Sequence, residues 1–141
     1  MEERRGKLIA MDAEVIRVLI GESVPDVLAV YLFGSQAECS ADEHSDIDVA
    51  VLASKRIEPY ARFRLQERIA STLGRDVDLV DLRQASTVMR AQVVSGGRLL
   101  MDRDRYARAL FELTTLSDYA RLNEERRHIL EDIRERGTIY G

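Results

Sequence analysis

The chain has 141 residues and a mass of 16.0 kDa, is 45% hydrophobic, and carries a formal net charge of −4 with a pI near 5.3. This size fits one compact domain, and the acidic balance argues against direct nucleic-acid binding. No apolar run approaches the roughly 18 residues of a membrane span, one cysteine cannot form an internal disulfide, and the N-terminus lacks a secretory pattern, so we expect a cytoplasmic protein.

The first third of the chain predicts a helix and two strands. Apolar residues recur at helical spacing from Leu8 to Leu19, which indicates an amphipathic helix that ends near Gly21. The β-branched and aromatic run 27–34 is typical of a buried strand that ends in a turn, and 46–53 predicts a second strand.

The middle of the chain alternates between helices and strands. Apolar residues on one face predict a helix over 58–73, and Gly74 is a natural stop. The run 76–82 predicts a short strand, 86–94 a helix with a serine cap, and 98–102 an edge strand.

The last segment, from Asp104 to about Arg136, predicts one long helix with an apolar stripe among many charges. We expect most of the stripe to pack inside the molecule. A helix of about thirty residues is longer than a small sheet can cover, so the half beyond about Asn123 is expected to bind a partner or a second copy. The stripe consists of Tyr106, Leu110, Leu113, Leu122, Ile129 and Ile133.

The order of these elements predicts an α/β (α+β) fold with a small mixed sheet flanked by helices, which we place on one side of it. We expect residues 1–103 to form the core and residues 104–141 to form a helical extension packed on that core.

Two acids interrupt the apolar start of the second predicted strand. Asp46 and Asp48 lie two residues apart, so their side chains share one face, about 7 Å apart. Their repulsion next to apolar strands would raise a pKa unless a cation lies between them. Mg²⁺ suits such a pair because it takes oxygen ligands and completes its shell with water and substrate phosphates. The alternative is a strand start that simply faces solvent.

A third acid favours a metal site over a strand start that faces solvent. Asp78 lies between Val77 and Leu79, and an adjacent strand would bring it within about 5 Å of the first pair. Asp76 and Asp81 stand at the ends of this strand, where turn or capping roles suffice.

Gly34 and Ser35 end the first strand, one loop before the paired acids. A glycine lets the backbone approach a ligand closely, and a serine hydroxyl with neighbouring N–H groups can hold a phosphate. The combined pattern predicts a phosphate cradle opposite a metal-binding carboxylate cluster.

Gly34-Ser35, Asp46-x-Asp48 and Asp78 together resemble the polymerase-β superfamily of nucleotidyltransferases. The short chain and the segments LFGS, DIDVAVL and DVDLVDL are most similar to its minimal MNT-type members, the antitoxins of HEPN/MNT toxin–antitoxin pairs. The resemblance implies a polymerase-β-like fold with a long C-terminal helix. It also implies that Gly34 and Ser35 hold the triphosphate, that Asp46 and Asp48 bind Mg²⁺, and that Asp78 completes the metal site or activates the attacking hydroxyl.

The resemblance further implies transfer of AMP from ATP to a tyrosine hydroxyl of a cognate HEPN-domain RNase toxin, in a hetero-oligomer that neutralises it. Two alternatives stay open: a non-catalytic antitoxin that acts by binding, and a nucleotidyltransferase for a small-molecule hydroxyl. The cation that neutralises the triphosphate is also open among Lys55, Arg56 and Arg90.

Overall fold

The computed structural model describes residues 8–34 and 46–137, and within these ranges it contains every element that the sequence predicts, close to the expected ends. In chain order they are α1 (Ala10–Ser23), β1 (Val27–Phe33), β2 (Ile47–Ala53), α2 (Pro59–Leu73), β3 (Val77–Asp81), α3 (Thr87–Gly96), β4 (Arg98–Asp102) and α4 (Arg105–Glu135).

The four strands form one mixed sheet, as predicted, and their order is β3-β2-β1-β4. Strand β1 is antiparallel to β2 and β4, whereas β2 and β3 run parallel and are joined through α2. The end of β1 and the starts of the other three strands therefore meet at one end of the sheet. The acids and the glycine turn belong to this end.

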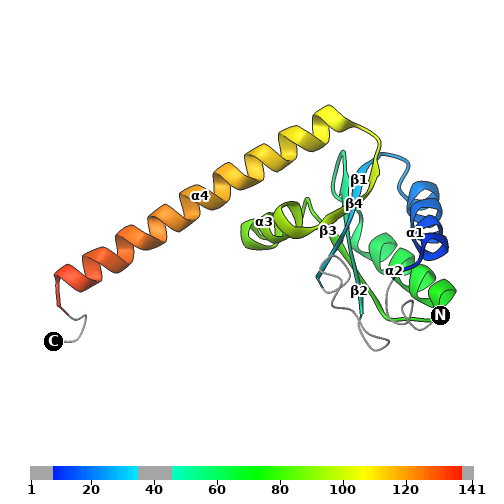
Figure 1. The fold of residues 1–141 in the computed structure, drawn as a ribbon, viewed down its shortest axis with the longest axis horizontal. Coiled ribbons are helices and arrows are strands. Elements are labelled where there is room, and N and C mark those ends of the chain that lie inside the picture. The colour runs from blue at the N-terminus through cyan, green and yellow to red at the C-terminus, as the bar shows by residue number, and fades with distance from the viewer. Residues whose placement is uncertain (1–7, 35–45, 138–141) are drawn as a thin grey trace.

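Helices cover both faces of the sheet, with α1 and α2 on one side and α3 and α4 on the other (Figure 1). The expectation that all helices pack on one side is wrong. Strand β2 shows the reason, because it is apolar on both faces: Val49 and Val51 join the core with α1 and α2, and Ala50 and Leu52 join the core with α3. Two apolar faces need two covering layers.

Side chains from α2 occupy the outer edge of β3. The backbone N–H of Leu79 donates to Gln66 Oε1 at 2.9 Å, and the Leu79 carbonyl accepts from Arg62 at 2.9 Å. Outward-facing backbone groups of this edge residue are thus already satisfied within the chain.

The first half of α4 is anchored to the body of the molecule. The Phe111 ring lies under two guanidinium groups, 5.5 Å from Arg83 and 5.7 Å from Arg90. One position further along, Glu112 accepts a 2.7 Å hydrogen bond from the hydroxyl of buried Tyr31 on β1. These contacts fix the direction in which the helix leaves the sheet.

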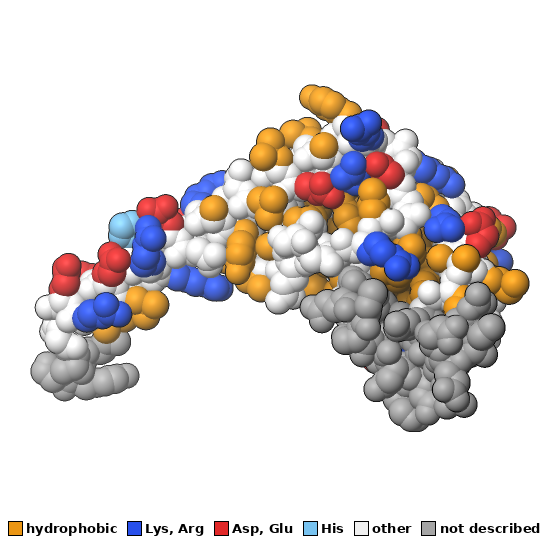
Figure 2. Space-filling view, viewed as in Figure 1, with side chains coloured by type: hydrophobic (Ala, Val, Ile, Leu, Met, Phe, Trp, Pro, Cys, Tyr) orange, Lys and Arg blue, Asp and Glu red, His pale blue; other side chains and the backbone are white. Residues whose placement is uncertain are grey.

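Most of the predicted apolar stripe of α4 is exposed, so the expectation that it packs inside the molecule is wrong. The exposed fractions are 81% for Tyr106, 54% for Leu110, 65% for Leu113 and 60% for Ile129. The far half of α4 projects beyond the sheet (Figure 1), and charged side chains recur along it (Figure 2). Of the helices in the described ranges, none combines the length and the apolar character that crossing a membrane requires.

Candidate functional site

The three predicted aspartates lie at the same end of the sheet. Asp48 and Asp78 are each the second residue of their strands, and the parallel register pairs them directly. Neighbouring strands are about 4.8 Å apart, so these two side chains leave the same sheet face side by side. Asp46 precedes Asp48 by two residues and shares its direction. This face is the one that α3 covers.

The three carboxylates repel one another. The pKa of Asp48 is raised, first because the side chain is half-buried and then because Asp78 and Asp46 place negative charge beside it. Asp46 and Asp78 are themselves exposed. A cation between the carboxylates would relieve this repulsion and lower the pKa.

The acids alone do not form a complete metal cage. Across residues 8–34 and 46–137, no three Asp, Glu, His or Cys side chains are already grouped as the ligands of one metal ion. Mg²⁺ needs only one or two carboxylates when water and substrate phosphates supply the rest. The donor set therefore fits a hard cation that arrives with a phosphate ligand.

Gly34 stands against this cluster at the end of β1. Its φ is +67°, and a Cβ built on it would collide with Oδ2 of Asp48. Only glycine suits both the left-handed backbone and this close approach. The neighbouring Ser35, predicted to hold the triphosphate, lies outside the described residues.

A surface hollow of about 560 Å³ opens beside Gly34. Among the described residues, the others that line it are Phe33 from β1 and Gln92, Ser95 and Gly96 from the last turns of α3. Phe33 pairs with Asp48 across the antiparallel strands, so the hollow adjoins the acids. Sequence reasoning missed Gln92 and Ser95, which are ordinary polar residues until the fold places them opposite Gly34.

The three cations considered from the sequence are not placed for a phosphate at this site. Lys55 and Arg56 follow the far end of β2, about 20 Å along the strand from Asp48. The Arg90 guanidinium donates to the carbonyls of Leu82 at 2.7 Å and Arg83 at 2.8 Å, so it holds the chain together instead.

Arg98, which sequence reasoning missed, begins β4 at the same end of the sheet as the acids. It is exposed and pairs with Leu32 of β1. Leu32 belongs to the core with α1 and α2, so Arg98 starts on the face opposite Asp48. Its only sequence signal is its place directly after Gly96-Gly97.

Asp81 has the structural role that its strand-end position predicted. Its buried carboxylate accepts from the backbone N–H groups of Ile57 at 2.8 Å and Arg83 at 3.0 Å. Asp76 contributes its carbonyl, which accepts from the N–H of Ile47 at 3.0 Å.

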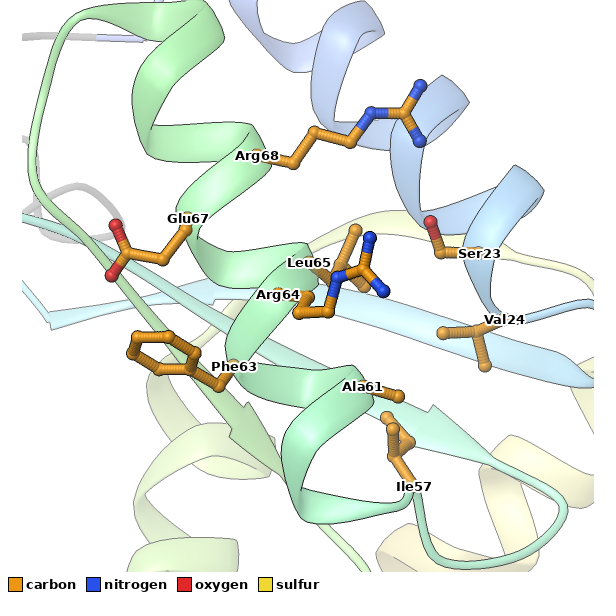
Figure 3. A pocket seen from close by; sticks show the side chains of 9 residues that line it. All are labelled: Ser23, Val24, Ile57, Ala61, Phe63, Arg64, Leu65, Glu67 and Arg68. Carbon is orange, nitrogen blue, oxygen red and sulfur yellow. The ribbon is translucent and has the colours of Figure 1, made fainter.

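A second hollow, also about 560 Å³, lies between the end of α1 and α2 on the opposite face (Figure 3). Arg64 and Arg68 extend over it from α2, and Ser23 borders it from α1. None of its lining residues contacts the aspartates. We assign the candidate chemistry to the hollow beside Gly34, because Gly34 stands against the Asp48 carboxylate and Phe33 is the register partner of Asp48.

Comparisons with known proteins show what the chain is similar to. The polymerase β nucleotidyltransferase family model matches residues 14–106, which include Gly34 and all three aspartates. Protein adenylyltransferase MntA from Shewanella oneidensis is 42% identical over 115 residues, which is 82% of either chain.

Solved structures give the same result. The chain superposes on one from a toxin–antitoxin crystal structure with AMP-PNP, with a TM-score of 0.79 and 40% identity, over 86% of this chain and 97% of that one. A structure of a tri-AMPylated Shewanella oneidensis HEPN toxin in complex with an MNT antitoxin contains a chain that matches with a TM-score of 0.74 and 39% identity, over 87% and 96%.

Proposed function

The chain belongs to the polymerase β nucleotidyltransferase family, and from that premise we propose that it is an MNT-type antitoxin that transfers AMP from ATP to a tyrosine hydroxyl of a HEPN-domain toxin. A relative named as a protein adenylyltransferase, a related complex with an ATP analogue and a related AMPylated toxin support this. The observation that carries the proposal is the register that sets Asp48 beside Asp78, with Gly34 against them.

We propose that Asp46, Asp48 and Asp78 hold Mg²⁺, because their carboxylates share one sheet face and raise the pKa of Asp48 when no cation is between them. When bound, Mg²⁺ would neutralise phosphate oxygens and stabilise the charge that develops on the α-phosphoryl group.

The residues of the chain supply position and charge for the transfer. Gly34 leaves room for a phosphate to approach the end of β1, and Ser35 would add a hydroxyl donor there. The toxin hydroxyl attacks the α-phosphorus, the bond to the bridging oxygen breaks, and pyrophosphate leaves. Asp78 is exposed on the neighbouring strand, where it would accept the hydroxyl proton or complete the metal site.

The test is AMP transfer to the purified cognate toxin with ATP and Mg²⁺, followed by intact-protein mass. We expect Asp48→Asn to lose transfer, because it removes one anionic ligand. Asp12→Asn is the matched control, since Asp12 lies in α1 on the opposite face. Full activity in Asp48→Asn would contradict the proposal.

The same assay separates the two rival functions. Neutralisation of the toxin without any added AMP would indicate an antitoxin that acts by binding alone. Transfer to a small hydroxyl compound but not to the toxin would indicate the other enzyme.

We also propose that residues 1–103 form the catalytic core and that 104–141 form an extension whose far half contacts the toxin. The exposed fractions of Ile129 and Leu130, 60% and 61%, support this. Ile129→Lys should weaken co-purification with the toxin, whereas Asn123→Lys, the same added charge at a polar position, should not. Equal affinity in the two variants would contradict the assignment.

We place the reaction in the cytoplasm, where ATP is available. The chain has a single cysteine and so forms no internal disulfide, which is compatible with that compartment.

A further inference from the structure

We propose that the hollow beside Gly34 binds the nucleoside part of the nucleotide donor, and that Gln92 selects adenine. The inference rests on the proposed function and adds the residue that sets base selectivity. It follows from the position of the hollow, the polarity of its α3 wall and the chemistry of its side chains.

Position is the first argument. Gly34 packs against the Asp48 carboxylate, and Phe33 is the register partner of Asp48. Both residues therefore link the hollow to the acids. The opposite wall is the last turn of α3, and the chain just after it passes close to β1: a Cβ built on Gly97 would lie 3.1 Å from the carbonyl oxygen of Leu32. A nucleotide with its phosphates at the acids would have its nucleoside within reach of a space of about 560 Å³.

Polarity sets the orientation of the ligand. The α3 wall is the C-terminal end of a ten-residue helix, whose last carbonyls lack intrahelical donors and carry partial negative charge. Such an end repels phosphates but accepts hydrogen bonds from ribose hydroxyls and an exocyclic amine. The phosphates are therefore expected on the Gly34 side and the nucleoside on the α3 side.

Side-chain chemistry identifies the selecting residue. Gln92 is exposed, and within the described ranges its carboxamide makes no hydrogen bond. An amide pairs well with the N7 edge of adenine, because its oxygen accepts from the 6-amino group while its NH₂ donates to N7. On the same edge guanine presents two acceptors, O6 and N7, so the amide oxygen finds no donor there. The half-exposed ring of Phe33 offers a stacking surface that suits any base.

The decisive measurement is kcat/KM for nucleotide transfer to the toxin from ATP and from GTP, with Mg²⁺ and the full chain. The wild type should prefer ATP. Gln92→Ala should lower the ATP/GTP ratio by about fivefold to 100-fold, mainly through KM, because a bidentate base contact discriminates by roughly that factor. Asn123→Ala removes an exposed amide from α4 and should keep the ratio.

A second variant distinguishes selection from general damage. Phe33→Leu should raise KM for both nucleotides and leave their ratio unchanged, because stacking is tolerant of the base. A ratio that is unchanged in Gln92→Ala, or a wild type without ATP preference, would overturn the inference.

Binding decides the matter even if the proposed function fails. Calorimetry with AMP-PNP and with the matching guanine analogue needs no acceptor. A lower preference for AMP-PNP in Gln92→Ala would support the subsite in a chain that transfers nothing, whereas an equal preference in the variant and the wild type would refute it.

Discussion

Gly34 and Gly74 offer a matched pair of substitutions that separates backbone strain from damage to the site. Both glycines have nearly the same left-handed backbone, with φ of +67° and +68°. A Cβ on Gly34 would collide with the Asp48 carboxylate, whereas a Cβ on Gly74 would meet nothing within 4 Å. Alanine at either position therefore adds the same backbone strain, but only Gly34→Ala displaces Asp48, a proposed ligand of Mg²⁺.

The magnitudes follow from these contacts. A left-handed alanine costs about 1–2 kcal/mol. For a chain of 141 residues this corresponds to a fall in Tm of about 3–8 °C. Displacing the half-buried Asp48 side chain adds about 1 kcal/mol of rotamer strain in Gly34→Ala. The larger effect is on activity, because a shift of about 1 Å at a reacting centre costs about 100-fold in rate.

The assay pairs thermal unfolding with AMP transfer to the toxin, normalised to folded protein. We expect both variants to unfold at a lower temperature, Gly74→Ala to keep the wild-type rate, and Gly34→Ala to lose about 100-fold or more. Equal transfer rates in the two variants would refute the placement of Gly34 against Asp48.

Three further predictions follow from the contacts described above. The folded state raises the pKa of Asp48, so the negative charge on this carboxylate destabilises the fold as the pH rises through that pKa. In EDTA at neutral pH, Asp48→Asn should therefore have a Tm equal to or above that of the wild type. Added Mg²⁺ should raise the Tm of the wild type only. A lower Tm for Asp48→Asn in EDTA would contradict this sign. Tyr31→Phe should lower the free energy of unfolding in urea by about 2 kcal/mol, because Glu112 loses a charge-assisted hydrogen bond. A decrease below about 0.5 kcal/mol would show that the bond is not formed. Asp81→Ala should lower the free energy of unfolding by about 2–3 kcal/mol, because the buried N–H of Ile57 loses its acceptor. AMP transfer per folded molecule should stay unchanged. A loss of transfer would mean that Asp81 contributes to the site.

The sequence predicted the fold well where the pattern is local. Glycine stops and side-chain caps mark real helix ends: Gly74 takes the left-handed conformation after α2, and Ser86 accepts from the N–H of Met89 at the start of α3. The mixed sheet with its long C-terminal helix is the polymerase-β-like fold that the motifs implied.

Helix α1 ends at Ser23, close to the predicted end near Gly21, and the Val24 N–H still bonds to the Ile20 carbonyl. Local patterns failed where packing decides. The side of the sheet on which a helix packs depends on the path of the chain between strands, which the apolar period of a helix does not encode.

For the candidate site, the sequence supplied the acids but not their surroundings. Asp46 and Asp48 could be paired by counting along one strand, and Asp78 by assuming that the next strand is a neighbour. The walls of the hollow come from α3, more than forty positions after Asp48, so Gln92 could not be connected to it without the fold. Lys55 and Arg56, two of the three cations that the sequence left open, follow the end of β2 that lies away from the acids.

The hold of α2 on Leu79 has a consequence for how copies of this chain meet. The N–H and the carbonyl of Leu79 are hydrogen-bonded to Gln66 and Arg62, so a strand of another molecule cannot form backbone hydrogen bonds with β3 at that residue. The border next to Asp78 is thereby closed to sheet extension and to the aggregation that follows from it. The edge beside Asp78, part of the proposed site, is therefore unavailable for strand pairing with a second copy of the chain at Leu79.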